Sequence, residues 1–286
     1  MQTDSSNRRW GTWLLIAGGL FIALVIIYYA FQFASKLDWA YVIAHFLDQP
    51  LLEGAKTTIL LSVTAQAVGI LLGLIAALMK MSNSPIPLIN IILRGVAGFY
   101  VWLFRGTPLL VQLIIFATGL YEVGIHLGLV EAALLALSLN EGAYMSEIVR
   151  AGIQSVDPGQ AEAAKSLGMT YGLSMRRIIL PQAARVIIPP TGNEFNNMLK
   201  SSSLAYTIGI VELLAQAGNL NHLYFKTLET FMIVSCYYLV MTTVWTWIQG
   251  RIESRLGERK SSDVAPGFWS RVRSNVLSTR SQVGHG

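Results

Sequence analysis

The sequence predicts an all-α integral membrane protein, a bundle of about six transmembrane helices. Of its 286 residues, 53% are hydrophobic and 13% are charged, whereas soluble domains carry about 25% charged residues. A chain this apolar cannot hide its hydrophobic surface in one core, so the lipid bilayer is its natural solvent. Six stretches are long enough to cross the hydrocarbon core, which takes about 20 residues of helix. They cover residues 13–33, 57–79, 95–121, 127–148, 186–214 and 228–248.

Three of these stretches carry features that matter for their interpretation. The first is not followed by a small-residue cleavage site, so we interpret it as a span and not as a signal peptide. The third contains Arg105 and Pro108, which we expect to shape a break in the helix. The fifth is expected to be broken at Pro189 and Pro190 for the same reason.

Positive charge is unequally divided between the two sides of the predicted bundle. Six spans place both termini on one side, and an excess of Lys and Arg marks the cytoplasmic side. The connections on the side of the termini hold sixteen Lys and Arg, against Lys36, Lys56 and Lys226 on the other. Both termini and the loop over residues 150–185 are therefore expected in the cytoplasm. The net charge of +5 comes from this excess, and we expect no nucleic-acid partner.

The cytoplasmic loop contains signals for a short, closed helix. Asp157 can cap its start, Pro158 suits the first turn, and Gln160 at the third position completes a capping box. Gly168 suits the left-handed residue that ends a helix. We therefore predict a helix of about ten residues that protrudes between two spans.

A second helix is expected to run from about Tyr171 to Pro181. The first helix has small side chains at Ala161, Ala163 and Ala164, which allow close approach by a partner. The residues alone leave two interpretations open. The loop either satisfies only its own backbone or docks into another protein.

The loop resembles the EAA signature of permease subunits of ABC importers. Glu162-Ala163-Ala164 is followed after three residues by Gly168, and after nine more by the sequence IILP. The flanking RGTPLLVQ at residues 105–112 and LKSSSL at residues 199–204 are similar to the polar amino-acid group, which includes histidine, glutamine and arginine importers. The resemblance covers roughly residues 52–250.

The resemblance implies a type I ABC importer permease bundle in a bacterial cell membrane, which is the inner membrane if the bacterium has two. It implies that the loop is a coupling helix that docks into an ATPase subunit. The residues expected at that contact are Gln160, Glu162, Ala163, Ala164, Leu167 and Gly168. The implied partners are a second permease chain, identical or a sister, two ABC ATPase subunits and an extracytoplasmic amino-acid-binding protein.

The expected domain organisation follows from the same resemblance. Residues 1–55 form a cytoplasmic tail, an additional first span and an external segment. Residues 56–250 form the transmembrane domain, with the coupling loop at about 151–185. Residues 251–286 are expected to be a flexible basic tail near the membrane surface.

We expect no cofactor, metal site or catalytic residue in the chain. A phosphate-binding P-loop requires a Gly-Lys pair, and the sequence has none, so ATP and magnesium are expected in the partner ATPase. Cys236 is the only cysteine, and the four histidines are scattered. No nucleophile–base pair is visible.

Polar residues within two spans predict a substrate site, because ionisable groups in a membrane usually face a cavity or a partner. An amino acid needs donors for its carboxylate and acceptors for its ammonium group. The candidates are Asn140, Glu141, Tyr144, Asn197, Lys200 and Ser201. A purely structural role, in which Glu194 and Lys200 pair with other helices and hold the dimer together, is the alternative. The set expected to be structural is Arg105, Pro108, Glu147 and Arg150.

The resulting hypothesis is the permease subunit of an ATP-driven importer for a polar amino acid, working by alternating access. The charge of Glu141 hints at a cationic substrate side chain. The principal alternative is a stand-alone secondary amino-acid transporter. An integral membrane enzyme and a permease for another solute class are further alternatives.

Overall fold

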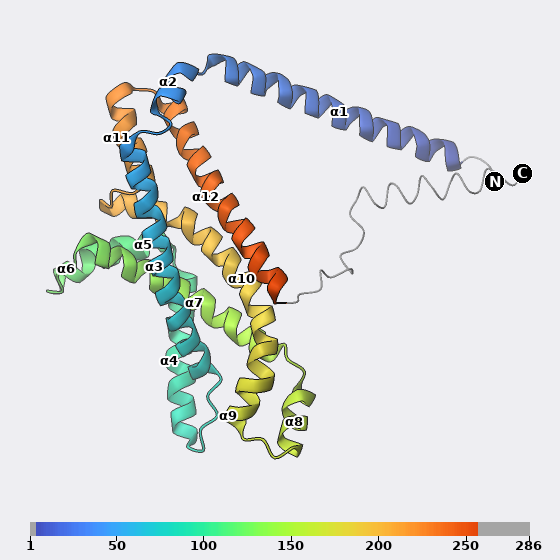
Figure 1. Cartoon of the computed structure of the whole chain (residues 1–286), viewed down its shortest axis with the longest axis vertical. Coiled ribbons are helices and arrows are strands. Elements are labelled where there is room, and N and C mark those ends of the chain that lie inside the picture. Colours follow the sequence, from blue (N-terminus) through green and yellow to red (C-terminus); the bar gives the residue numbers. More distant parts are fainter. Residues whose placement is uncertain (1–3, 257–286) are drawn as a thin grey trace, which may run out of the picture. The chain divides into compact units, whose positions relative to one another are not determined.

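The computed structural model describes residues 4–256, with side chains from residue 13 onward, and every element in that range is helical (Figure 1). The first part comprises α1 (Asp4–Lys36), α2 (Trp39–His45), α3 (Gln49–Lys80), α4 (Pro87–Gly106), α5 (Leu109–Ile114), η1 (Ile115–Gly119), α6 (Leu120–Glu122) and α7 (Leu129–Gln154). The second part comprises α8 (Pro158–Ser166), α9 (Tyr171–Ser174), η2 (Met175–Ile179), α10 (Leu180–Ser201), η3 (Ser202–Ile208), α11 (Leu213–Tyr224) and α12 (Thr227–Arg255).

The described chain divides into two compact units, which are treated separately. The first contains residues 4–57 and 211–237, and the second contains residues 58–210 and 238–256. The helices α3 and α12 each contribute to both units.

In the first unit, polar contacts fasten the turn between α1 and α2 to the start of α12. The Asp38 carboxylate accepts a hydrogen bond from the Tyr41 amide at 3.1 Å, which caps α2. It also pairs with the Lys226 ammonium at 3.1 Å. The Tyr41 amide, together with Lys226, lowers the pKa of Asp38 below its ordinary value. The Tyr41 hydroxyl and the Thr230 hydroxyl lie 2.9 Å apart and complete the attachment.

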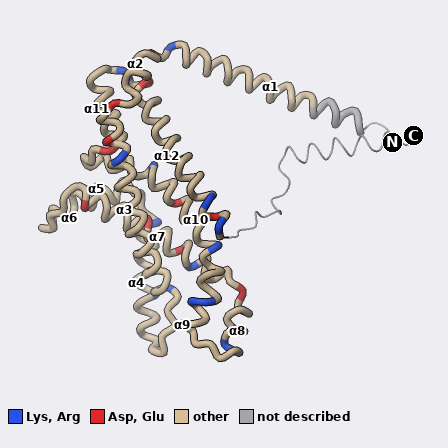
Figure 2. The backbone as a smooth tube through the Cα atoms, viewed as in Figure 1, with Lys and Arg blue, Asp and Glu red and all other residues tan. Residues whose placement is uncertain are grey.

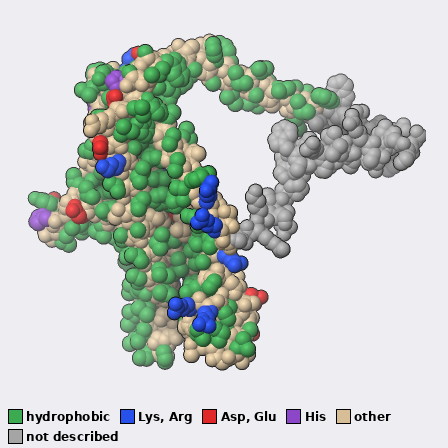
Figure 3. All heavy atoms as spheres, in the orientation of Figure 1, with side chains coloured by type: hydrophobic (Ala, Val, Ile, Leu, Met, Phe, Trp, Pro, Cys, Tyr) green, Lys and Arg blue, Asp and Glu red, His purple; other side chains and the backbone are tan. Residues whose placement is uncertain are grey.

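The second unit is built around α7, which packs along α10 and also contacts α4 (Figure 1). Thirteen of the 26 residues of α7 are buried. Two clusters of buried apolar side chains line its faces. One is centred on Leu61, Leu113, Leu137 and Met198, and the other on Ala77, Met145, Val149 and Ile179. Outside these contacts, hydrophobic side chains cover the visible face of α3 and α4, as expected for lipid contact (Figure 3).

Glycines bring α3 and α7 unusually close together. A Cβ atom added at Gly69 would lie 2.6 Å from Cγ of Glu141, and one added at Gly142 would lie 2.8 Å from Cβ of Leu72. At Gly73 the added atom would collide with Met145. Gly69 and Gly73 form a GxxxG pattern, which allows membrane helices to approach closely.

The expected break in the third predicted span is present, but it separates two different helices. α4 ends at Gly106, Thr107 and Pro108 are extended, and α5 begins at Leu109. The Gln112 side chain donates to the carbonyl of Phe104 at 2.9 Å and to the carbonyl of Thr107 at 3.1 Å. These bonds satisfy backbone groups that the break leaves open.

Two proline predictions were wrong. Pro181 does not end a helix, because the π-helical segment η2 precedes it and α10 continues through it. Pro189 and Pro190 lie inside α10 without breaking it. Neighbouring side chains compensate for backbone bonds lost at prolines in membrane helices. Here Gln249 of α12 donates to the Pro189 carbonyl at 3.2 Å, which ties α10 to α12 but does not replace the bonds that the Arg185 and Val186 carbonyls lose.

The span boundaries also differ from the sequence prediction. Four helices in the described range are long and apolar enough to cross a membrane, or five if Tyr171–Ile208 and Leu213–Tyr224 form one span. α7 has 26 residues and is long enough to cross, but with Glu131, Glu141 and Glu147 it is too polar to be counted by composition, and half of its residues are buried by other helices. The predicted basic tail begins within α12, which continues to Arg255, and residues 257–286 lie outside the described range.

Gly73→Val tests the close α3–α7 contact. The new side chain would meet Met145, so we expect a loss of about 1–3 kcal/mol in the free energy of unfolding. Thermal unfolding of the purified protein in detergent, followed by tryptophan fluorescence, would measure it. Gly98→Val in α4 is the matched control, since nothing lies within 4 Å of the added atom there. Equal destabilisation by both variants would contradict the close contact.

Candidate functional site

A polar cavity of about 500 Å³ lies between α5, α7, α10 and η3. Its volume falls in the range of about 300–1,000 Å³ that is usual for small-molecule sites. All six residues predicted as a substrate site line it, although the three on α7 and the three on α10 lie more than 50 residues apart in the sequence. The lining consists of Leu109, Asn140, Glu141, Tyr144, Glu194, Asn197, Met198, Lys200, Ser201 and Leu204.

The α7 wall of the cavity is held by neighbouring helices. The Asn140 amide donates to the Phe104 carbonyl at 3.0 Å and to the Gln112 side chain at 3.1 Å. The Arg105 guanidinium lies over the Tyr144 ring, 5.0 Å from its centroid. The break between α4 and α5 therefore orients two polar side chains of the cavity.

Glu141 is the buried charge of this wall. Its side chain is 4% exposed, and its Oε1 accepts a hydrogen bond from Gln66 Nε2 of α3 at 3.0 Å. A carboxylate this deeply buried is costly unless it is hydrogen-bonded or faces a partner. The Gln66 amide provides one such bond, and the cavity provides room for a cationic partner.

The α10 wall presents four polar side chains on one helix face. Glu194, Asn197, Lys200 and Ser201 follow each other at intervals of three, three and one, which brings all four to the cavity. The Ser203 hydroxyl is not among them, and it donates to the Lys200 carbonyl at 2.7 Å. The cavity thus combines an ammonium group, two carboxylates, amides and hydroxyls, which can hold both ends of a zwitterion.

Sequence reasoning missed two residues that support this site. Gln112 belongs to an otherwise apolar helix, and Gln66 is the one strongly polar residue of the second predicted span. Both glutamines are 5% exposed and bonded to a cavity residue. A lone buried amide in an apolar stretch was the available signal, but it does not reveal its partner.

The loop between α7 and α10 folds as a capped helix followed by a turn. The Asp157 carboxylate accepts from the Gly159 amide at 2.7 Å, and Gly168 is left-handed with φ of +75°. Gln160 does not complete the predicted capping box. Its side-chain oxygen instead accepts from Gln182 of α10 at 3.5 Å. Figure 2 shows Lys and Arg recurring along this loop and at the end of α12.

The residues predicted for ATPase contact differ in how exposed they are to solvent. Leu167 is 79% exposed, and Gln160, Glu162, Ala163 and Gly168 are exposed as well. Ala164 is only 1% exposed, so it packs within the loop and not on the free face of α8. A partner that docks on this chain would therefore meet Leu167 and Ala163 before Ala164.

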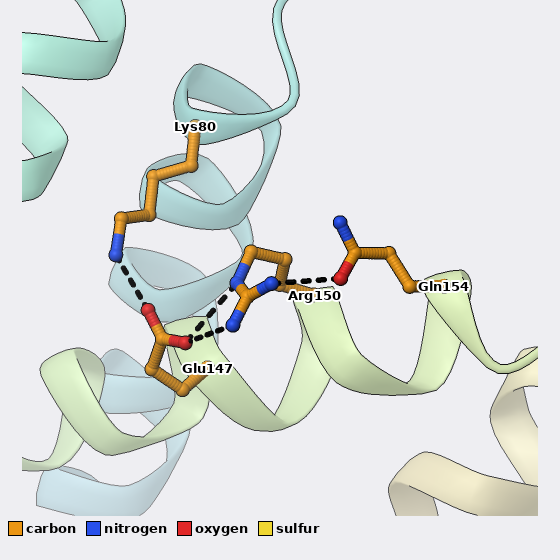
Figure 4. A network of polar contacts seen from close by, with 4 residues as sticks. All are labelled: Lys80, Glu147, Arg150 and Gln154. Carbon is orange, nitrogen blue, oxygen red and sulfur yellow. Dashed lines mark hydrogen bonds and ion pairs between the residues drawn. The ribbon is translucent and has the colours of Figure 1, made fainter.

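An ion-pair network joins α3 to α7 (Figure 4). The expected pair is present, with Arg150 Nη2 2.6 Å from Glu147 Oε2. Lys80 of α3 pairs with the other carboxylate oxygen at 2.5 Å, and Arg150 also donates to Gln154 at 2.7 Å. Glu147 lies on α7 between the cavity residue Tyr144 and the coupling loop. The network therefore holds together the segment that connects the two candidate sites.

Comparison with known proteins gives the cavity and the loop a context. Residues 69–258 match the protein family described as binding-protein-dependent transport system inner membrane component. The chain belongs to this family. It is a permease subunit of an ABC importer with the type I fold, and a separate subunit hydrolyses ATP. The stand-alone secondary transporter is not supported by this assignment.

Individual relatives agree with the family. This permease is 38% identical to the arginine transport system permease protein ArgU of Corynebacterium glutamicum, over 83% of this chain and 77% of the relative. It is 37% identical to the probable amino-acid permease protein YxeN of Bacillus subtilis, over 78% of this chain and 98% of the relative. A solved amino acid ABC transporter, described with histidines, is 40% identical with a TM-score of 0.69, over 77% and 99%.

A more distant structure shares only the fold. A bacterial ABC transporter that imports the acidic polysaccharide alginate is 16% identical, with a TM-score of 0.64. The matched region covers 88% of this chain and 98% of the chain in that structure. Within residues 4–256, no group of three or more metal-ligating side chains could hold a metal ion.

Glu147→Gln tests the network of Figure 4. It leaves two cations facing a neutral amide, so we expect about 1–2 kcal/mol of lost stability, more than for Lys80→Met. Thermal unfolding of the purified protein would measure both. Glu53→Gln is the control, because the Glu53–Lys56 pair is long and exposed and should contribute little. A larger effect at Glu53 would show that the network is not stabilising.

Proposed function

We propose that this permease subunit imports a polar amino acid, and that the cavity between α7 and α10 is where the substrate passes. The observation that carries the proposal is the composition of the cavity. Lys200 and the carboxylates of Glu141 and Glu194 line the same cavity of about 500 Å³. A free amino acid requires a cation for its carboxylate and an anion for its ammonium group. The names of the relatives, which include arginine and amino-acid permeases, point to the same class.

The charges of the cavity favour a cationic side chain on that amino acid. Lys200 can pair with the α-carboxylate, and one glutamate can pair with the α-ammonium group. This leaves the second glutamate for another positive charge. A basic amino acid such as arginine or lysine provides it, whereas a neutral amino acid leaves one of the two carboxylates without a cationic partner.

The assembly proposed for transport contains several subunits. Two permease chains, identical or sisters, form the pathway in the bilayer, and an extracytoplasmic amino-acid-binding protein delivers the substrate. Two ABC ATPase subunits bind ATP and magnesium, and the loop over residues 155–181 docks into one of them. Closure of the ATPase pair moves the loops and rocks the permeases between inward-facing and outward-facing states.

The excess of Lys and Arg supports an inner-membrane orientation with both termini in the cytoplasm. It places the coupling loop on the side where ATP is available. We also propose that residues 56–250 form the transport domain, with residues 1–55 and 251–286 as additions at the two ends. The family match over residues 69–258 is compatible with this division.

Glu141→Gln tests the substrate site. The variant keeps the shape of the side chain and removes its charge, so uptake of L-arginine should fall about tenfold more than uptake of L-glutamine. ATP-dependent uptake by proteoliposomes that contain the full complex and its binding protein would measure this. Glu131→Gln, at the exposed start of the same helix, is the matched control and should leave uptake unchanged. Unaltered uptake and selectivity in Glu141→Gln would remove this residue from the site.

Gly168→Asp tests the coupling loop. Nothing lies within 4 Å of an added Cβ atom at Gly168, so the strain that any side chain has at this positive φ stays within the exposed loop, and membrane insertion should be preserved. The carboxylate would stand on the exposed face beside Leu167, and we expect it to abolish substrate-stimulated ATP hydrolysis in the assembled complex. Gly168→Ala is the control, since it brings the same strain at the positive φ without the carboxylate, and it should keep most of the stimulation. Full stimulation in Gly168→Asp would contradict docking by this segment.

A further inference from the structure

The deepest polar contact of the cavity comes from a helix that does not line the cavity. Gln66 of α3 is 5% exposed and Glu141 of α7 is 4% exposed, and their side chains meet at 3.0 Å. Gln66 donates through Nε2 and Glu141 accepts through Oε1. The other carboxylate oxygen of Glu141 is thereby left for a group inside the cavity.

Packing restricts where the Glu141 side chain can lie. One turn further along α3, Gly69 has no side chain, and an added Cβ atom there would lie 2.6 Å from Cγ and 2.8 Å from Cβ of Glu141. The stem of Glu141 therefore rests against bare backbone. Packing thus fixes the stem, and the hydrogen bond from Gln66 fixes the carboxylate at its end.

The orientation of the Gln66 amide is also determined by its surroundings. Nε2 faces two acceptors, Glu141 Oε1 and the sulfur of Met145 at 3.8 Å. Oε1 of Gln66 is buried and has no hydrogen-bond partner. If the amide were flipped, this oxygen would face the Glu141 carboxylate. The hydrogen bonds that Nε2 donates to Glu141 and to Met145 would then both be lost. Gln66 thus acts on Glu141 only as a donor.

We propose that Gln66 is a positioning residue that determines specificity, because it holds the Glu141 carboxylate in the orientation that binds the cationic side chain of the substrate. This inference rests on the proposed function of the cavity. Without the donor, the buried carboxylate loses a charge-assisted hydrogen bond and turns toward another partner, such as Lys200 across the cavity. Binding of a basic amino acid then weakens more than binding of a neutral one.

Gln66→Met tests the proposal, because it keeps the length of the side chain and removes the amide. Binding of labelled L-arginine and L-glutamine would be measured by equilibrium dialysis on the complete permease–ATPase complex in nanodiscs, without the binding protein. We expect L-arginine binding to weaken about tenfold and L-glutamine binding to change much less. In a Glu141→Gln background, Gln66→Met should have no further effect on the ratio, since both changes act through the same carboxylate.

Two further variants separate positioning from folding. Gln249→Met makes the same change at a buried glutamine of α12 that does not line the polar cavity, and it should leave the binding ratio unchanged. Gln66→Asn draws the amide back by one methylene with a small change in volume. It should reduce the preference for L-arginine even if Gln66→Met does not assemble.

The outcomes distinguish the proposal from the function on which it rests. An altered ratio in Glu141→Gln with an unaltered ratio in both Gln66 variants overturns the role of Gln66 alone. A Gln66 effect that persists in the Glu141→Gln background also overturns it, because the effect would not pass through Glu141. Unaltered binding in Glu141→Gln overturns the assignment of the cavity, and the role of Gln66 with it.

Discussion

The close approach of α3 to α7 is the constraint on which the rest of the second unit depends. Gly69, Gly73 and Gly142 remove the side chains that would otherwise separate the two helices. Without a large hydrophobic driving force between helices in lipid, such contact depends on packing and hydrogen bonds. Here the contact combines both, since the stem of Glu141 rests against Gly69 and its carboxylate is bonded to Gln66.

This arrangement explains why α7 can be polar without being unstable. A helix with three glutamates is a poor lipid-facing span, but half of α7 is covered by neighbouring helices. Three of its polar groups within the bundle meet specific partners, whereas the buried Ser146 hydroxyl has none. Asn140 bonds to Gln112, Glu141 to Gln66, and Glu147 to Lys80 and Arg150. The cavity and the coupling loop are therefore connected by one helix whose side chains are fixed along its length.

The loop and the cavity differ in how rigidly the chain holds them. Cavity residues are supported by buried amides from α3 and α5, which is what a selective site requires. The coupling loop presents Leu167 almost fully exposed and ends its helix at a left-handed glycine. An exposed apolar side chain at a helix end suits contact with another subunit better than isolation in water.

The sequence by itself determined the membrane character, the capped loop, the pair formed by Glu147 with Arg150, and the polar residues that line the cavity. These depend on composition and on local spacing, which a single chain displays directly. It did not predict that α10 continues through Pro181, Pro189 and Pro190, because contacts with other helices, such as the hydrogen bond from Gln249 of α12 to the Pro189 carbonyl, are not visible in the local sequence. Only the tertiary structure decided that Gln66 and Gln112 support the cavity. Their partners lie 75 and 28 residues away, and long-range contacts of this kind depend on how the helices pack.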